Sequence, residues 1–442
     1  MKKKSRNGKK SADRKGKAPE KIVPVDLLLH HTGEFFNDLD CAQEVFRVAD
    51  PVLEQKDRER KQELDCFFKR AEQSRDRNDR KHLREEDVFK FISTIQKLYR
   101  GHRLFRNNTF IALVSRFDEY VGDVIRTLHK AYPDRLKNSE RTLSYEEIAS
   151  STTLQHAVDR LINKEVDKVL RDSHLAQVRY LENQLGIQIK DGVGNWHDFV
   201  EITERRNILV HCGGTISAQY LRVCKSQGCQ LEPKLKEGAI LSVTPEYFER
   251  AHKVLYELAF KISQTIARKL FPDSLKKIDV MLNQQGVELL NQERWLLALL
   301  IFDYATNLPL KATSDDQTRK IFLINKCIAL KFSGKSSESC KILDDVDWSS
   351  ANTAFQLAVE VLKNNFKVAE GIMAKMNGDD PISEIDFKTW PLFKEFRKTD
   401  YFQRAFKQIY KKDYDELGVA KELQQKLQQN STGIAPIAVK SE

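Results

Sequence analysis

The chain has 442 residues, which is enough for two or three domains of ordinary size. Its 31% charged and 40% hydrophobic residues, with few Gly and Pro, are typical of a helix-rich, water-soluble protein. No apolar run approaches the roughly 20 residues of a membrane-spanning helix, and no apolar stretch follows the lysine-rich N-terminus as in a secretory signal. We therefore expect a cytoplasmic protein that does not enter a membrane.

The first segment of the chain, residues 1–25, is expected to be a disordered basic tail. Ten Lys or Arg occur in residues 1–21 against two acidic residues, so most of the net charge of +10 lies there. Such a tail adds a salt-dependent attraction for RNA or DNA phosphates, although the same composition also serves solubility alone. The lysines considered as RNA contacts are Lys2, Lys3, Lys4, Lys9 and Lys10.

Residues 26–104 are predicted to form an N-terminal helical region. Apolar residues recur here at helical spacing, as from Val88 to Leu98, and residues 76–86 are almost wholly charged. The charged stretch is consistent with a solvated helix or with a turn between two helices. The sequence leaves open whether this region is a separate domain or packs as extra helices on the domain that follows.

Residues 105–272 are predicted to fold as an all-α bundle. Its first helix starts near Asn108 and ends at Tyr132-Pro133, and a capping box of Ser144 and Glu147 marks the next helix start. A helix that begins at Asn195 is expected to end at Gly213-Gly214. The two helices expected between these are residues 154–171 and 173–186.

Residues 273–429 are predicted to form a helical-repeat-like domain, and residues 430–442 a disordered end. The expected helices are 274–291, 293–308, 317–333, 336–344, 351–362, 365–376, 393–410 and 414–428. Trp295, Ala298, Phe302 and Ala305 resemble the aromatic and small positions of a tetratricopeptide helix pair, although no 34-residue period is present. Such an array is expected to bind a protein regulator or antitoxin.

The most informative segment is residues 204–214, which read ERRNILVHCGG. It resembles the R-polar-x3-H signature of the HEPN superfamily, whose four- to five-helix domains include many metal-independent RNases of toxin–antitoxin and phage-defence systems. The segment LVSRFDEYV at residues 113–121 resembles the first core helix of that family. The resemblance covers about residues 105–270 and implies an RNase-toxin type of protein.

Arg206 and His211 are the candidate catalytic pair. A histidine can accept the proton of the RNA 2′-hydroxyl or protonate the leaving 5′-oxygen, and a permanently charged arginine can stabilise the phosphorane. No metal is needed, and the expected products are a 2′,3′-cyclic phosphate and a 5′-hydroxyl. Because residues five apart on a helix are offset by about 140° and 7.5 Å, one copy alone does not make a compact site. We expect a homodimer that pairs two copies of the motif, as the resemblance also implies.

Several neighbours are candidates for supporting roles. Asn207 shares a helix face with His211 and could orient its ring, and Asp118 and Glu119 could fix Arg206 or Asn207 from the facing helix. Arg205 is a possible phosphate contact, with a solvated surface arginine as the alternative.

A zinc site and a cofactor site are not expected. Seven cysteines without a Cys-x-x-Cys pair favour reduced thiols, and the group His211, Cys212, Cys224 and Cys229 lacks the spacing of zinc ligands. No Walker loop or Rossmann fingerprint occurs.

Two rival functions remain open at this stage. One is a non-catalytic interaction scaffold, and the other is a nucleic-acid-binding protein without turnover.

Overall fold

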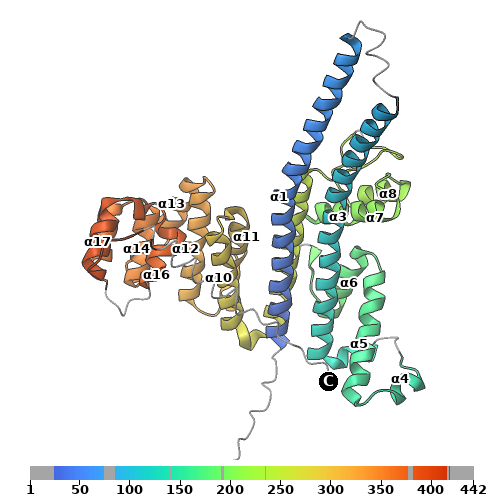
Figure 1. The fold of residues 1–442 in the computed structure, drawn as a ribbon. Helices are drawn as coiled ribbons and strands as arrows, with labels where there is room; N and C mark the ends of the chain where they lie inside the picture. Colours follow the sequence, from blue (N-terminus) through green and yellow to red (C-terminus); the bar gives the residue numbers. More distant parts are fainter. Residues whose placement is uncertain are drawn as a thin grey trace, which may run out of the picture. The chain divides into compact units, whose positions relative to one another are not determined.

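The computed structural model describes residues 24–73, 85–138, 142–190, 194–233, 235–376, 382–415 and 418. The protein is all-α, as predicted: these residues contain no β-strand, and one isolated antiparallel bridge joins Thr215 to Ile240. The chain divides into two compact units, Met1–Ser263 and Gln264–Glu442 (Figure 1). Within the described part, no helix combines the length and apolar character needed to cross a membrane.

The first unit is built on two very long helices that lie side by side, α1 (Pro24–Gln73) and α3 (Glu85–Ala131) (Figure 1). The predicted boundary between residues 104 and 105 therefore falls inside α3 and does not separate two domains. The apolar spacing changes near residue 104, which suggests a boundary, but the helix continues without a break through Gly101 and Asn108.

A buried polar cluster fixes how α1 and α3 pair. The two ring nitrogens of His102 lie 2.9 Å from an Asp50 carboxylate oxygen and 2.6 Å from one of Asp57. Arg106 donates a further hydrogen bond of 2.8 Å to Asp50. Burial opposes ionisation of Asp50, but the hydrogen bonds from Arg106 and His102 outweigh it and hold its pKa below the ordinary value. These hydrogen bonds form only when the two helices are in this register.

The core of the first unit continues where α9 (Pro245–Leu270) packs on α1 through aromatic rings. Phe46 stacks on Phe248 with ring centroids 4.0 Å apart, and Phe36 stacks on Tyr256 at the same separation. These rings are nearly inaccessible to solvent, so their burial is a large share of what holds the helices together.

The shorter helices of the first unit complete the bundle. They are α4 (Tyr145–Ala149), α5 (Leu154–Arg171), α6 (His174–Leu185), α7 (Trp196–His211) and α8 (Ala218–Ser226), with the 3₁₀ helix η1 (Pro133–Asn138) before them. The capping box of Ser144 and Glu147 is confirmed. Gly213 and Gly214 follow α7 with φ of 59° and 88°, values that a side chain disfavours, which confirms the predicted helix end.

The second unit is a series of short helices that pack against their neighbours in sequence. They are α10 (Leu275–Asn291), α11 (Trp295–Thr306), α12 (Asp316–Phe332), α13 (Ser336–Asp344), α14 (Thr353–Leu362), α15 (Phe366–Met373), α16 (Glu384–Thr389) and α17 (Asp400–Tyr410), with 3₁₀ helices η3 (Pro272–Ser274), η4 (Leu310–Ala312), η5 (Pro391–Phe393) and η6 (Phe396–Lys398). The six helices predicted from 274 to 376 are confirmed.

The end of the second unit differs from the prediction. The single helix expected over residues 393–410 is instead η6 followed by α17, because the Thr399 side chain caps the start of α17. The helix α16 was not predicted. Most of the helix expected over 414–428, the end at 430–442 and the N-terminal tail lie outside the described residues.

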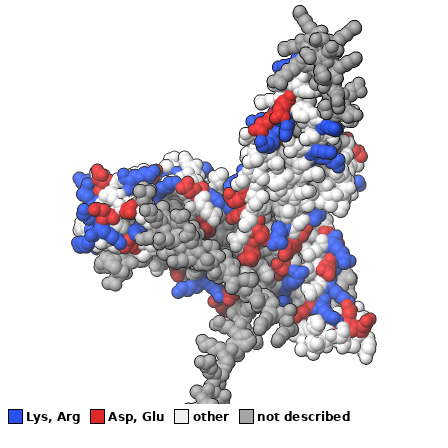
Figure 2. Space-filling model, in the orientation of Figure 1, with Lys and Arg blue, Asp and Glu red and all other residues white. Residues whose placement is uncertain are grey.

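The α10–α15 array has a packed core but unequal repeats. Ala298, Phe302 and Ala305 are fully buried, in keeping with the core positions proposed for them. The first helices of the three pairs begin at Leu275, Asp316 and Thr353, so their spacing is not constant. Figure 2 shows Lys and Arg interspersed with Asp and Glu over the face in view.

Removing Asp50 tests the buried cluster. Asp50→Ala leaves His102 and Arg106 with only part of their counter-charge, so we expect a loss of about 3 kcal/mol of stability. Urea unfolding followed by circular dichroism measures the loss. The matched control is Asp65→Ala, which removes an exposed carboxylate from the same helix and is expected to change stability by less than about 0.5 kcal/mol. Equal midpoints for the two variants would contradict this account.

Replacing two glycines of the second unit by alanine is expected to change stability in opposite directions. A Cβ at Gly286 would run into the ring of fully buried Phe302, so Gly286→Ala is expected to cost about 1–3 kcal/mol. A Cβ at Gly371, inside α15, meets open space, so Gly371→Ala is expected to gain about 0.5–1 kcal/mol from helix propensity alone. Thermal denaturation of the two variants should shift in opposite directions, and a stabilising Gly286→Ala would show that the α10–α11 contact is wrong.

Candidate active site

A cavity of about 380 Å³ lies where α3, α6, α7 and α8 meet. The helix α7 supplies most of its functional groups because the polar side of this otherwise buried helix faces the opening. The charged and hydrogen-bonding residues around it include Asp118, His174, Glu204, Arg206, Asn207 and His211. The structure therefore brings both members of the predicted catalytic pair, together with Asn207 and Asp118, to one cavity.

The Arg206 guanidinium is half-buried and held from two sides. Its Nη2 lies 3.4 Å from a carboxylate oxygen of Asp118 on α3, and its Nη1 donates a hydrogen bond of 3.2 Å to the Asn207 side chain. The other Asp118 oxygen lies 2.8 Å from Nε2 of His174, so this one carboxylate lies between Arg206 and the His174 ring. This is the placement predicted for Asp118.

His211 is exposed in the last turn of α7, one turn beyond Asn207. Among the described residues no hydrogen-bond partner of its ring is found, so both nitrogens can face a ligand. Arg206 and His211 share the cavity but occupy different positions along the helix, as their spacing of five residues requires.

Two residues of the cavity were missed by sequence reasoning. His174 is the first residue of α6, thirty positions before the motif, and nothing in its local sequence shows that it meets Asp118. Glu204 lies two residues before Arg206, and its sequence context does not distinguish it from a surface carboxylate. Burial raises its pKa, although nearby His174 and a hydrogen bond from Asn207 act in the opposite direction.

Glu119 and Arg205 do not take the places predicted for them. Glu119 is outside the cavity and pairs with Arg116 on its own helix. Arg205 is buried: its Nε donates to Glu201 at 2.7 Å and its guanidinium stacks over the Tyr247 ring at 3.7 Å. The prediction that Arg205 contacts phosphate is therefore wrong, because its donors are engaged inside the protein.

The remaining predicted contacts fall elsewhere. Lys2, Lys3, Lys4, Lys9 and Lys10 lie outside the described residues. Across the described ranges, no cluster of three or more His, Cys, Asp or Glu has an arrangement that could hold a metal ion. Cys212, Cys224 and Cys229 are free thiols there.

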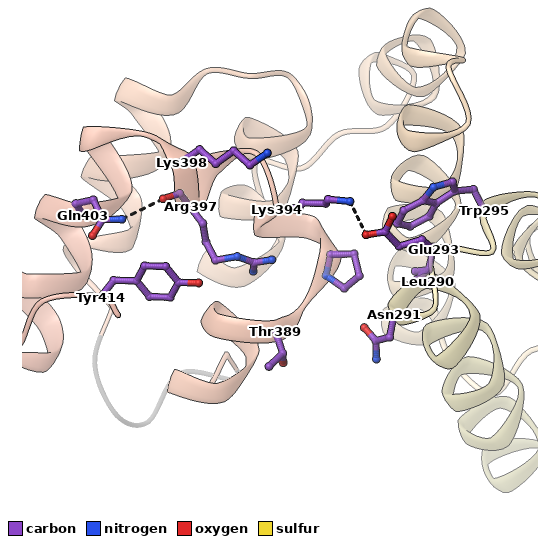
Figure 3. A pocket seen from close by; sticks show the side chains of 11 residues that line it. Leu290, Asn291, Glu293, Trp295, Thr389, Lys394, Arg397, Lys398, Gln403 and Tyr414 are labelled. Carbon is purple, nitrogen blue, oxygen red and sulfur yellow. Dashed lines mark hydrogen bonds and ion pairs between the residues drawn. The ribbon is translucent and has the colours of Figure 1, made fainter. Parts of the chain in front are cut away.

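The second unit has cavities of its own. One of about 530 Å³ is lined by basic and aromatic groups, among them Trp295, Lys394, Arg397 and Tyr414 (Figure 3). Lys394 pairs with Glu293 at 2.5 Å, and Arg397 donates hydrogen bonds to backbone carbonyls. Another cavity, of about 330 Å³, lies among α10, α12, α14 and α16.

Comparison with family models, with characterised proteins and with solved structures gives no match for this chain.

The raised pKa of Glu204 predicts a pH-dependent effect on stability. A folded state with the higher pKa binds the proton more tightly, so its advantage is present at low pH and is lost as the pH rises past the ordinary value of 4.5 and then the raised one. Glu204→Gln removes the buried charge and should raise the melting temperature at pH 7.5, with a smaller effect at pH 4. The control Glu237→Gln alters an exposed carboxylate and should show neither effect. An equal shift at both pH values would contradict the prediction.

Proposed function

We propose that this chain is a metal-independent endoribonuclease of the HEPN type, and that Arg206 and His211 carry the reaction. The observation that supports this most is the shared cavity, in which a guanidinium held by a carboxylate lies on the same helix as an imidazole whose ring nitrogens are open to a ligand. These are the two groups that RNA cleavage without a metal requires.

The reaction follows from the chemistry of these groups. His211 of one copy takes the proton of a ribose 2′-hydroxyl, whose oxygen then attacks the adjacent phosphorus. Arg206 stabilises the negative charge of the pentavalent phosphorane. The P–O5′ bond breaks, the leaving oxygen takes a proton from the histidine of the second copy, and the products are a 2′,3′-cyclic phosphate and a 5′-hydroxyl. Asp118 keeps the guanidinium in place through the 3.4 Å contact and so acts as a positioning residue.

The proposed active form contains two copies of the chain. Arg206 and His211 line one cavity but are offset along α7, and from this offset we infer that a single copy does not direct both groups at one phosphate. A twofold axis next to the cavity would supply a second histidine and arginine. With this activity the protein would act as an RNA-degrading toxin or antiphage effector in the cytoplasm.

Cleavage of RNA in excess chelator tests the proposal. We expect the full-length protein to cut RNA and to leave DNA of the same sequence intact, because DNA has no 2′-hydroxyl. Arg206→Ala and His211→Ala should each reduce the cleavage rate by roughly 10²–10⁴-fold. The matched controls Arg222→Ala and His156→Ala remove exposed residues of the same types and should keep the wild-type rate. Undiminished cleavage by His211→Ala would disprove the assignment.

A second candidate function is a non-catalytic interaction scaffold. The specific observation that favours it is the pair of cavities in the second unit, one basic and aromatic and the other largely apolar. As a scaffold, the chain would bind a regulator on the α10–α16 array, and the Arg206 cavity would catalyse no reaction. RNA that is bound but never cut would instead favour the third candidate, a nucleic-acid-binding protein.

A further inference from the structure

The helix α8 ends in a Schellman motif with a cysteine at each of its two contact positions. The Cys229 N–H donates to the Cys224 carbonyl at 2.9 Å, and the Gly228 N–H donates to the Lys225 carbonyl at 3.2 Å. These are the 6→1 and 5→2 hydrogen bonds that define the motif. Gly228 has φ of 72°, the left-handed conformation that the motif requires and that glycine adopts most easily.

The motif brings the two thiols together. In a Schellman motif the side chains at these two positions commonly touch, and the contact is usually between apolar groups. Here Cys224 is fully buried in a cluster with Ile208 and Tyr220, and half-buried Cys229 packs against the same cluster. The Cys229 thiol also lies 3.2 Å from the carbonyl oxygen of His197, which holds it on this side of the turn.

We propose that Cys224 and Cys229 form an oxidisable dithiol, which hydrogen peroxide or a similar small peroxide converts into an intrachain disulfide. This modification site is separate from the proposed nuclease function and stands whether or not the chain cleaves RNA. A disulfide needs Cα atoms about 4.4–6.8 Å apart, and the backbone hydrogen bond between the same two residues already draws their main chains together.

The order of the two steps follows from access to solvent. Cys229 is the more exposed thiol, and its hydrogen bond with Cys224 lowers its pKa, so it supplies the thiolate. Its sulfur attacks peroxide, the O–O bond breaks, and sulfenic acid and one water form. The Cys224 sulfur then attacks the sulfenic sulfur and displaces a second water. Two thiols and one peroxide thus give one disulfide and two waters.

Peptide mapping of the full chain tests the proposal directly. The native protein is treated with hydrogen peroxide, quenched, and alkylated in denaturant before tryptic digestion. Because Lys225 lies between the two cysteines, trypsin releases residues 223–225 and 226–234 as separate peptides. We expect these two peptides to appear joined. The mass of the joined species should be the sum of the two unalkylated peptides minus two hydrogens, and reduction with dithiothreitol should separate them.

Two variants and an internal reference make the result decisive. Cys224→Ser and Cys229→Ser should each abolish the joined peptide, and the monomer band in a non-reducing gel should show that the bond is intrachain. Exposed Cys41, Cys66 and Cys212 report how far peroxide has acted. If those thiols are oxidised while both peptides are recovered separately alkylated, the contact at the end of α8 is packing alone and the proposal is wrong.

Discussion

The buried carboxylate of Glu201 organises the frame behind the candidate site. It accepts hydrogen bonds of 2.7 Å from the hydroxyls of Tyr220 on α8 and Tyr247 on α9, and one of the same length from Arg205 on its own helix. A buried charge without partners is very costly, so these donors must converge on it whenever the unit is folded. The result is a fixed rotation of α7 about its axis. With Arg205 turned inward, Arg206, about 100° further round the helix, faces the cavity.

The charge of the cavity gives an independent reason for a composite site. Arg206 and His174 share the single carboxylate of Asp118, and Glu204 adds another acidic group nearby. A phosphate approaching one copy therefore meets a guanidinium whose charge is largely balanced. Held in place, that guanidinium has little freedom to lose on binding, but it attracts an anion weakly. Arg171 also lines the cavity and adds one positive charge, and a second copy would add more.

Local signals in the sequence were enough to place α7 and the glycines after it, and also the helices from α10 to α15, because capping residues and apolar spacing act over a few neighbouring positions. They could not show that Arg205 is buried, because it is adjacent to Arg206 and chemically identical to it. Arg205 is buried by its contacts with Glu201, one turn earlier on α7, and with Tyr247 on α9, and these contacts leave Arg206 available. His174 was missed for the same reason, since its partner Asp118 lies on another helix.

The helix α8 connects the two chemical features of this unit. Tyr220 at its start anchors Glu201, and Cys224, one turn later, shares an apolar cluster with Ile208 of α7. An S–S bond is shorter than the contact between two thiol sulfurs, so either Cys224 or Cys229 has to move when the disulfide forms. Cys224 is embedded in a close-packed core that resists displacement, whereas Cys229 follows a turn at the surface. In the proposed disulfide the turn would therefore move, so the cluster would stay in place and α7 would keep the rotation on which the Arg206 cavity depends.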